Sequence, residues 1–127
     1  MKDFINWFKK KNYLHSEKTR PNVSEREIWF CSLGENIGFE QDGRGNDFAR
    51  PCLILKKFNK EVCWIVPVTR NKKIGKYYLP ISTGDIDGSL ILSQLKLVDI
   101  KRCLYKSATL QENSFNLVKE KITQLLA

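Results

Sequence analysis

Histidine is almost absent from this chain of 127 residues, in which His15 is the only one. The four cysteines, Cys31, Cys52, Cys63 and Cys103, are widely spaced and form no Cys-x-x-Cys pair. A structural zinc site needs clustered cysteines and histidines, and a Ser-His or Cys-His nucleophile needs a histidine beside it. The sequence therefore predicts no metal site, and it argues against catalysis by a histidine-activated nucleophile.

Long apolar runs are missing as well. Runs such as 63–68 are only a few residues long, whereas a membrane-spanning helix needs about 20 apolar residues. The N-terminal segment has no apolar stretch followed by a small-residue cleavage site, so we expect no secretory signal. Unpaired thiols without an export signal fit a reducing compartment. We therefore expect a cytoplasmic protein that does not associate with a membrane.

Positive charge, in contrast, is abundant. The chain has 22 lysines and arginines against 14 acidic residues, which gives a net charge of +8. Half of this excess lies in residues 1–22, where six basic residues accompany two acidic ones. Clustered cations bind polyanions because they release counterions from a phosphate backbone. A nucleic acid is therefore the first partner to consider.

The charge divides the chain into a basic N-terminal extension, 1–24, and a single domain, 25–127. Phe4, Trp7 and Phe8 are spaced i, i+3, i+4, which places them on one face of a short helix. We interpret this helix as docked on the domain by its aromatic face, with an arm for a membrane surface or a nucleic acid as the alternative. Pro21 is expected to end the helix at about Arg20.

The domain shows the pattern of short strands separated by polar turns. Strands are expected at 28–31, 52–55, 61–69, 77–81, 89–92 and 96–100, with a glycine-containing loop at 38–50, a basic turn at 70–76 and a connection at 82–88. The strand at 61–69 is apolar enough to be covered on both faces. Trp64 and Tyr78 are expected in the core, with a role as stacking platforms for RNA bases as the alternative.

Only the C-terminal segment shows a clear helical pattern within the domain. Thr109 to Glu112 reads as a capping box, and an apolar stripe at 3-4-3 spacing follows, formed by Phe115, Val118, Ile122 and Leu125. Several strands and one terminal helix, without βαβ alternation, predict a mainly β protein, a small antiparallel barrel covered by a helix.

One set of motifs is more specific than these patterns because its members occur in a fixed order. Glu40-Gln41 opens the glycine-containing loop, Arg50-Pro51 closes it, and Thr69-Arg70 ends the third strand. Together with the segments 27–34, 50–55, 66–69, 89–94 and 98–104, these motifs resemble the PemK/MazF (Kid) family of toxin endoribonucleases, the mRNA interferases of type II toxin–antitoxin systems. The resemblance covers roughly residues 26–126.

The resemblance implies an SH3-like antiparallel β-barrel with a C-terminal α-helix, usually as a homodimer. It implies cleavage of single-stranded RNA, often mRNA, without a metal or cofactor, and inhibition by an acidic antitoxin. The family's catalytic arginine precedes the proline that follows the Glu-Gln loop, which is Arg50 here. Its catalytic threonine or serine ends the following strand, which is Thr69 here.

The chemistry of RNA cleavage suits these two residue types. The 2′-hydroxyl attacks the adjacent phosphorus and leaves a 2′,3′-cyclic phosphate and a 5′-hydroxyl. Negative charge grows on the phosphate oxygens, which a guanidinium matches with parallel donors and a threonine hydroxyl with one more. The base stays open: Arg50 is protonated at neutral pH, although the family gives it an acid/base role, and Glu40 is the only carboxylate that the matched motif offers.

Further candidates for RNA binding are polar and basic residues of the two loops, namely Gln41, Arg44, Arg70, Lys72, Lys73 and Lys76. Plainer roles are open too: Arg50 as a partner of Asp47 or Glu40, Thr69 as an ordinary strand end, and the basic turn as solvated surface.

The chain departs from the commoner members of the family in several places. Phe39 stands where smaller or polar residues are frequent, and Arg26 replaces a usual glycine. Asp42 to Ala49 intervene between Glu-Gln and Arg-Pro, which lengthens this loop, and short members lack the basic extension. Two other functions are possible on such a barrel, a gyrase poison or a non-catalytic RNA-binding protein.

Overall fold

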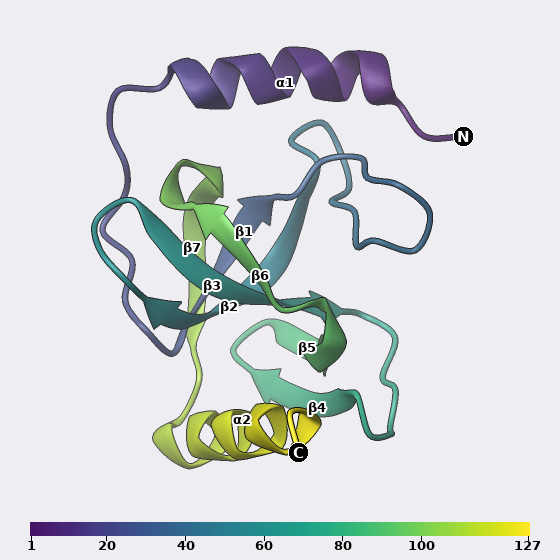
Figure 1. The fold of residues 1–127 in the computed structure, drawn as a ribbon, viewed down its shortest axis with the longest axis vertical. Helices are drawn as coiled ribbons and strands as arrows, with labels where there is room; N and C mark the ends of the chain where they lie inside the picture. Colours follow the sequence, from purple (N-terminus) through teal and green to yellow (C-terminus); the bar gives the residue numbers. More distant parts are fainter.

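The computed structural model describes all 127 residues. The chain forms one curled antiparallel sheet, with one helix at each of two opposite ends of the molecule (Figure 1). The sheet follows the order β4-β5-β3-β2-β1-β7, and β6 pairs with β3. Its strands are β1 (Glu27–Ser32), β2 (Ala49–Lys57), β3 (Val62–Thr69), β4 (Tyr78–Thr83), β5 (Ile86–Ile91), β6 (Lys96–Asp99) and β7 (Cys103–Thr109). The helices are α1 (Phe4–Ser16) and α2 (Glu112–Leu125). This half-barrel confirms the expected mainly β, SH3-like architecture with a C-terminal helix and a helical N-terminal extension.

Strand β3 connects the two parts of the sheet because it changes partner along its length. Its first half pairs with β6, with Ile65 opposite Lys96, and its end pairs with β5, with Val68 opposite Leu90. On its other side β3 pairs with β2. The sheet therefore curls at β3, and the end of this strand lies where the two parts meet.

Two apolar cores lie on the two faces of β1, β2 and β3. Along β2 the side chains alternate, with Leu53 and Leu55 in the core that α2 covers and Cys52 and Ile54 in the other. The second core holds all four cysteines, which are buried and unpaired. Such alternation is the direct result of the two-residue repeat of a strand. The expectation that β3 is covered on both faces is confirmed for most of its length.

One residue of β3 departs from this expectation. Trp64 is 41% exposed, so the prediction that it lies in the core is wrong. Its ring packs edge-on against Phe58, with the ring centroids 4.9 Å apart. Tyr78, also expected in the core, is half-buried.

The strand predictions need two corrections. The expected connection 82–88 is a two-residue turn, because Thr83 pairs directly with Ile86 and Gly84 takes a φ of 56°. Strand β7 was not predicted at all. It lies at the edge of the sheet, and Cys103 is its only buried residue, so its sequence carries no apolar alternation.

The N-terminal helix docks differently from the prediction. Trp7 and Leu14, two helical turns apart, are its buried residues, whereas Phe4 and Phe8 are exposed. The helix ends at Ser16 and not near Arg20, because Glu17 already has extended backbone.

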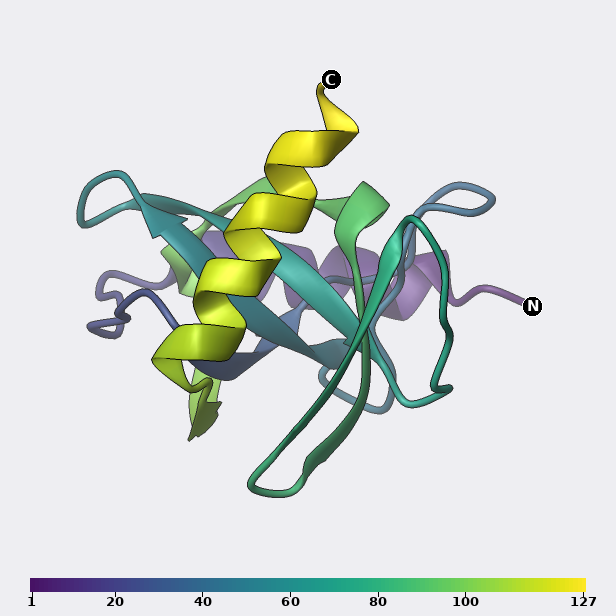
Figure 2. The same ribbon diagram turned by 90° about the horizontal axis from the view of Figure 1, so that it is seen from below.

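The C-terminal helix confirms the predicted stripe but not its cap. Phe115 and Val118 are buried, and Ile122 and Leu125 pack against the first core. The capping box is wrong: Gln111 is the N-cap and makes no side-chain capping bond, and Thr109 is the last residue of β7. Figure 2 shows α2, in yellow, lying across the sheet. Neither helix is long and apolar enough to cross a bilayer.

The segment between α1 and β1 is tied to the domain by an ion pair. Arg20 donates from Nε and Nη2 to the two carboxylate oxygens of Asp99, at 2.9 and 2.8 Å. Asp99 also accepts from the Lys101 amide at 2.8 Å. The bond from Arg20 is the main reason why the pKa of Asp99 lies below its usual value. Val23, a few residues later, is fully buried in the second core.

We therefore expect Asp99→Asn to lower the free energy of unfolding at neutral pH. The Asp99 side chain is 42% exposed, so solvent screening limits the loss to about 1 kcal/mol. A lowered carboxyl pKa stabilises the fold above the unfolded pKa, and this contribution disappears as pH falls through the folded pKa. Urea unfolding from pH 7 to pH 2 should thus show the two proteins converging below about pH 4. A difference that stays constant with pH would contradict this.

Candidate active site

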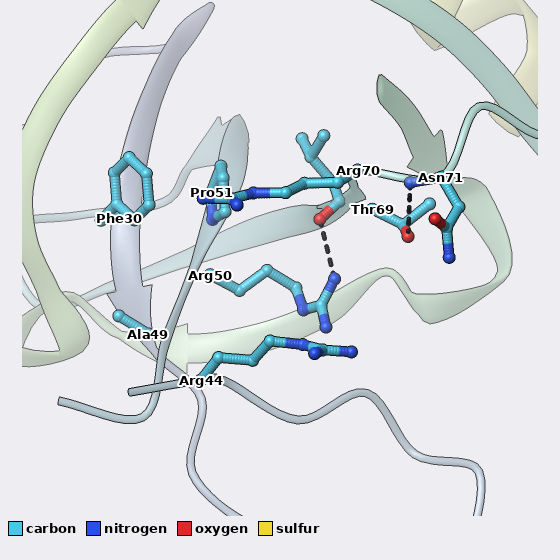
Figure 3. A pocket seen from close by; sticks show the side chains of 9 residues that line it. Phe30, Arg44, Ala49, Arg50, Pro51, Thr69, Arg70 and Asn71 are labelled. Atoms are coloured by element: carbon cyan, nitrogen blue, oxygen red, sulfur yellow. Dashed lines mark hydrogen bonds between the residues drawn. The ribbon is translucent and has the colours of Figure 1, made fainter. Parts of the chain in front are cut away.

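A cleft of about 400 Å³ opens where β2 begins and β3 ends (Figure 3). Because the two strands are antiparallel, with Cys52 opposite Pro67, the start of β2 lies beside the end of β3. This pairing brings Arg50 and Thr69 into one cleft although 18 residues, 51–68, lie between them in the sequence. The lining residues are Phe30, Arg44, Ala49, Arg50, Pro51, Val68, Thr69, Arg70 and Asn71.

Arg50 is held by backbone carbonyl groups. It is 8% exposed, and it donates from Nη1 to the Val68 carbonyl at 3.0 Å and from Nε to the Asp42 carbonyl at 2.7 Å (Figure 3 shows the first). With the Gln41 amide oriented to face it, Arg50 also donates from Nη2 to the Gln41 side-chain oxygen at 2.7 Å. Arg50 forms no ion pair with a carboxylate.

The plainer role of Arg50, a partner of Asp47 or Glu40, does not agree with these contacts. Asp47 pairs with Lys10 at 3.1 Å, and the Glu40 carboxylate accepts from the Ile37 amide at 3.0 Å. The positive charge of Arg50 is thus left without an acidic partner inside the protein.

The electrostatics of the cleft are strongly positive. Burial lowers the pKa of Arg50, and the neighbouring charges of Arg44 and Arg70 lower it further. The group nevertheless stays protonated at neutral pH because the ordinary pKa of arginine is so high. Three guanidinium groups and no carboxylate line the cleft, so it favours an anionic ligand.

Thr69 is the last residue of β3 and is half-buried. Its Oγ1 accepts from the Asn71 amide at 3.4 Å, which leaves the hydroxyl hydrogen available to a ligand. Gly88 of β5 packs directly against the end of β3, since a Cβ added to it would lie 2.0 Å from the Thr69 carbonyl oxygen.

Glu40 and Gln41 do not line this cleft. They line an adjoining hollow of about 350 Å³, which shares Arg44 and Arg50 with the cleft and does not include Thr69. Glu40 is exposed there. Arg50 therefore stands between the predicted carboxylate and the predicted hydroxyl donor.

The lysines of the basic turn lie outside the cleft. Of the residues predicted to bind RNA, only Arg44 and Arg70 line it. Lys72 pairs with Asp87 at 2.9 Å. The ammonium groups of Lys73 and Lys76 lie over the rings of Tyr78 and Tyr77, 5.4 and 5.7 Å from the centroids. The structure thus divides the candidate RNA-binding residues among the cleft, the adjoining hollow that holds Gln41, and an outer turn.

Three residues with a place in the site were not singled out from the sequence. Phe30 and Asn71 line the cleft, and Gln94 holds the neighbouring loop. The Gln94 side chain donates to the Phe39 carbonyl at 3.1 Å and accepts from the backbone amide of Gln41 at 3.3 Å. Phe30 and Gln94 lie within motif segments that carried the resemblance, which is the signal that points to them. Nowhere in the fold do three or more His, Cys, Asp or Glu side chains converge as metal ligands.

Comparison with known families settles the relationship. The sequence model of PemK-like, MazF-like toxins of type II toxin–antitoxin systems matches residues 24–126. This chain belongs to that family. No curated protein matches the sequence significantly.

Solved structures of two MazF proteins and of an endoribonuclease share its fold. MazF from Deinococcus radiodurans is 16% identical, with a TM-score of 0.66 over 86% of this chain and 98% of that one. The Mycobacterium tuberculosis toxin MazF-mt6 is 17% identical, with a TM-score of 0.61 over 80% and 96%. A mycobacterial endoribonuclease, solved in complex with its cognate antitoxin, is 12% identical, with a TM-score of 0.63 over 83% and 95%.

The close approach of β5 to Thr69 gives a test of the site's geometry. We expect Gly88→Ala to push the end of β3 outward, because its Cβ would lie 2.0 Å from the Thr69 carbonyl oxygen. Such overpacking costs about 1–3 kcal/mol. Urea unfolding should show the loss, and the backbone amide signals of Thr69 and Arg70 should shift. Ser82→Ala, at an exposed position of β4, is the control, and equal stability of the two variants would contradict the expectation.

Proposed function

We propose that this protein is the endoribonuclease toxin of a type II toxin–antitoxin pair, and that it cleaves single-stranded RNA, including mRNA, without a metal ion. The observation that carries the proposal is the meeting of Arg50 and Thr69 in a cleft with three guanidinium groups and no carboxylate. Membership of the PemK/MazF family supports it. So does the fold shared with a mycobacterial protein described as an endoribonuclease.

In this mechanism the scissile phosphate occupies the cleft beside Arg50. An arginine has five N–H donors, and the contacts to Val68, Asp42 and Gln41 use three of them. One N–H on each terminal nitrogen is then left for the phosphate oxygens. As the 2′-hydroxyl attacks phosphorus, these donors and the Thr69 hydroxyl stabilise the growing negative charge. The P–O5′ bond then breaks, and the departing 5′-oxygen takes a proton from solvent water to become the 5′-hydroxyl.

Because the backbone carbonyls already hold Arg50, its charge needs no reorganisation during the reaction. Preorganised donors in a site that excludes water are the most effective form of electrostatic catalysis. Protonated Arg50 cannot accept the proton of the 2′-hydroxyl, so the proposal gives this role to Glu40, which lines the hollow on the other side of the guanidinium.

The proposed partners are RNA and an acidic antitoxin, and the proposed location is the cytoplasm. The basic cleft and the net charge of +8 suit RNA and an acidic antitoxin. One structural neighbour was solved with its cognate antitoxin. A homodimer in the cytoplasm completes the proposal, and size-exclusion chromatography with light scattering tests the dimer.

The central experiment incubates the purified protein with end-labelled single-stranded RNA in EDTA. We expect cleavage to 2′,3′-cyclic phosphate and 5′-hydroxyl ends, and none where the scissile nucleotide carries a 2′-deoxyribose. Arg50→Ala should reduce the rate about 10²–10³-fold. Arg50→Lys should not restore it, because lysine lacks the two-pronged donor geometry. Lys60→Ala, an exposed position, is the control for the lost charge.

Three outcomes of that experiment would contradict the proposal. Undiminished cleavage by Arg50→Ala would remove Arg50 from the mechanism. Tight RNA binding without a cyclic product would indicate a non-catalytic RNA-binding barrel. DNA cleavage trapped with gyrase, without RNA breakdown, would indicate a gyrase poison.

Two further variants separate the roles of the hydroxyl and the carboxylate. Thr69→Val keeps the shape of the side chain and removes its donor, so we expect a loss of about 10–10²-fold in single-turnover rate. Thr69→Ser should keep most of the activity. Glu40→Gln should flatten the acidic side of the pH–rate profile, since a general base must be deprotonated to act. An unchanged profile would exclude Glu40 as the base.

A further inference from the structure

We infer that the N-terminal segment 2–16, which comprises helix α1 and the residues just before it, is a positioning element of the active site. In this segment Lys2 and Trp7 hold the β1–β2 loop so that Asp42 keeps Arg50 in place. This loop comprises residues 33–48. The inference rests on the proposed function for its effect on cleavage. Helix α1 lies outside the matched residues 24–126, so this role is an addition to the shared fold.

Lys2 connects three points of the loop. Its Nζ lies 3.1 Å from the Asp42 carboxylate and 3.2 Å from the Gly38 carbonyl, and it also donates to the Asn36 carbonyl. An ammonium group has three donors, so all of them go to this loop. The Lys2 and Asp42 side chains are only 29% and 25% exposed, which weakens solvent screening of the pair.

Trp7 holds both ends of the same loop. Its ring packs against Phe48, with the centroids 5.5 Å apart. At the other end it lies so close to Gly34 that an added Cβ would be 2.0 Å from the indole. Lys10, one turn further along α1, pairs with Asp47 at 3.1 Å. The helix thus lies along the loop, as Figure 1 shows at the end of the sheet remote from α2.

Asp42 connects the Lys2 contact to the active site through its own backbone carbonyl. Its carboxylate accepts from the Asn36 amide at 2.6 Å and binds Lys2, while its own carbonyl accepts from Arg50 Nε at 2.7 Å. The same residue is therefore held by its side chain and holds the guanidinium by its main chain. Arg50 has no carboxylate partner that would orient it otherwise.

The length of the loop explains why such a restraint is needed. The loop spans 33–48 and contains no helix and no strand of the sheet. Ordering each residue of such a segment costs about 1–2 kcal/mol of backbone entropy. The loop forms several hydrogen bonds within itself, such as the Gly43 amide to the Gly34 carbonyl at 2.9 Å, and the contacts from Lys2 and Trp7 add to them. Without these added contacts we expect the carbonyl of Asp42 to sample more positions, and the Arg50 side chain to be held less firmly.

The test compares Lys2→Ala with Lys9→Ala. Both variants remove one positive charge from the N-terminal segment, but Lys9 is exposed and forms no ion pair with the loop. We expect Lys2→Ala to lower the single-turnover cleavage rate about tenfold, because small misplacements of a catalytic group are costly. The Kd for a non-cleavable deoxy-substituted oligonucleotide should stay within about twofold of wild type, since Lys2 does not line the cleft. Lys2→Arg should restore the rate, and Lys9→Ala should leave it unchanged.

Hydrogen exchange provides a readout that does not depend on activity. The amides of Asn36 and Gly43 should exchange faster in Lys2→Ala than in Lys9→Ala, while core amides such as that of Ile54 stay protected. If both variants match wild type in exchange and rate, the inference is wrong. It is also wrong if the loop loosens and cleavage stays unchanged. If wild type cleaves no RNA, the proposed function fails, and exchange alone then decides whether α1 holds the loop.

Discussion

The guanidinium of Arg50 is the group on which the rest of the structure depends. A buried cation is normally balanced by a carboxylate, yet here carbonyl oxygens of Val68 and Asp42 take that place. Neutral dipoles orient the charge without cancelling it. The cleft therefore keeps an unneutralised positive potential at a fixed point, which is what a reaction that builds negative charge on a phosphate requires.

Each of those carbonyls depends on a different part of the fold. The Val68 carbonyl belongs to β3, where the strand changes partner from β6 to β5, so the curl of the sheet fixes it. The Asp42 carbonyl belongs to a long loop, and the side chains of Lys2, just before α1, and of Gln94 hold its surroundings. One support is thus intrinsic to the barrel, and the other depends in part on an N-terminal segment outside the residues matched by the family.

Those parts of the fold and of the candidate site that leave a local pattern in the sequence could be predicted from it. The stripe on α2 and the apolar runs of β1, β2 and β3 follow from helical and strand repeats. Arg50 and Thr69 could be found because the order of the motifs also records how β2 pairs with β3. Other features leave no local pattern in the sequence. Strand β7 is an exposed edge strand, and the cap of α2 depends on where β7 ends. The contact between Lys2 and Asp42 joins segments that are distant in the sequence. The aromatic spacing in α1 indicated a helix, but which face docks is decided by the loop beneath it.

The alternation along β2 links folding to chemistry. Its even-numbered residues Cys52 and Ile54 enter one core, and its odd-numbered residues Leu53 and Leu55 enter the other. A shift of β2 by a single residue against its neighbours would exchange these two sets, and it would also turn Arg50 away from the end of β3. If Arg50 acts as proposed, misregistered chains would therefore be inactive as well as poorly packed. On that mechanism the toxin cannot act before its strands are correctly aligned.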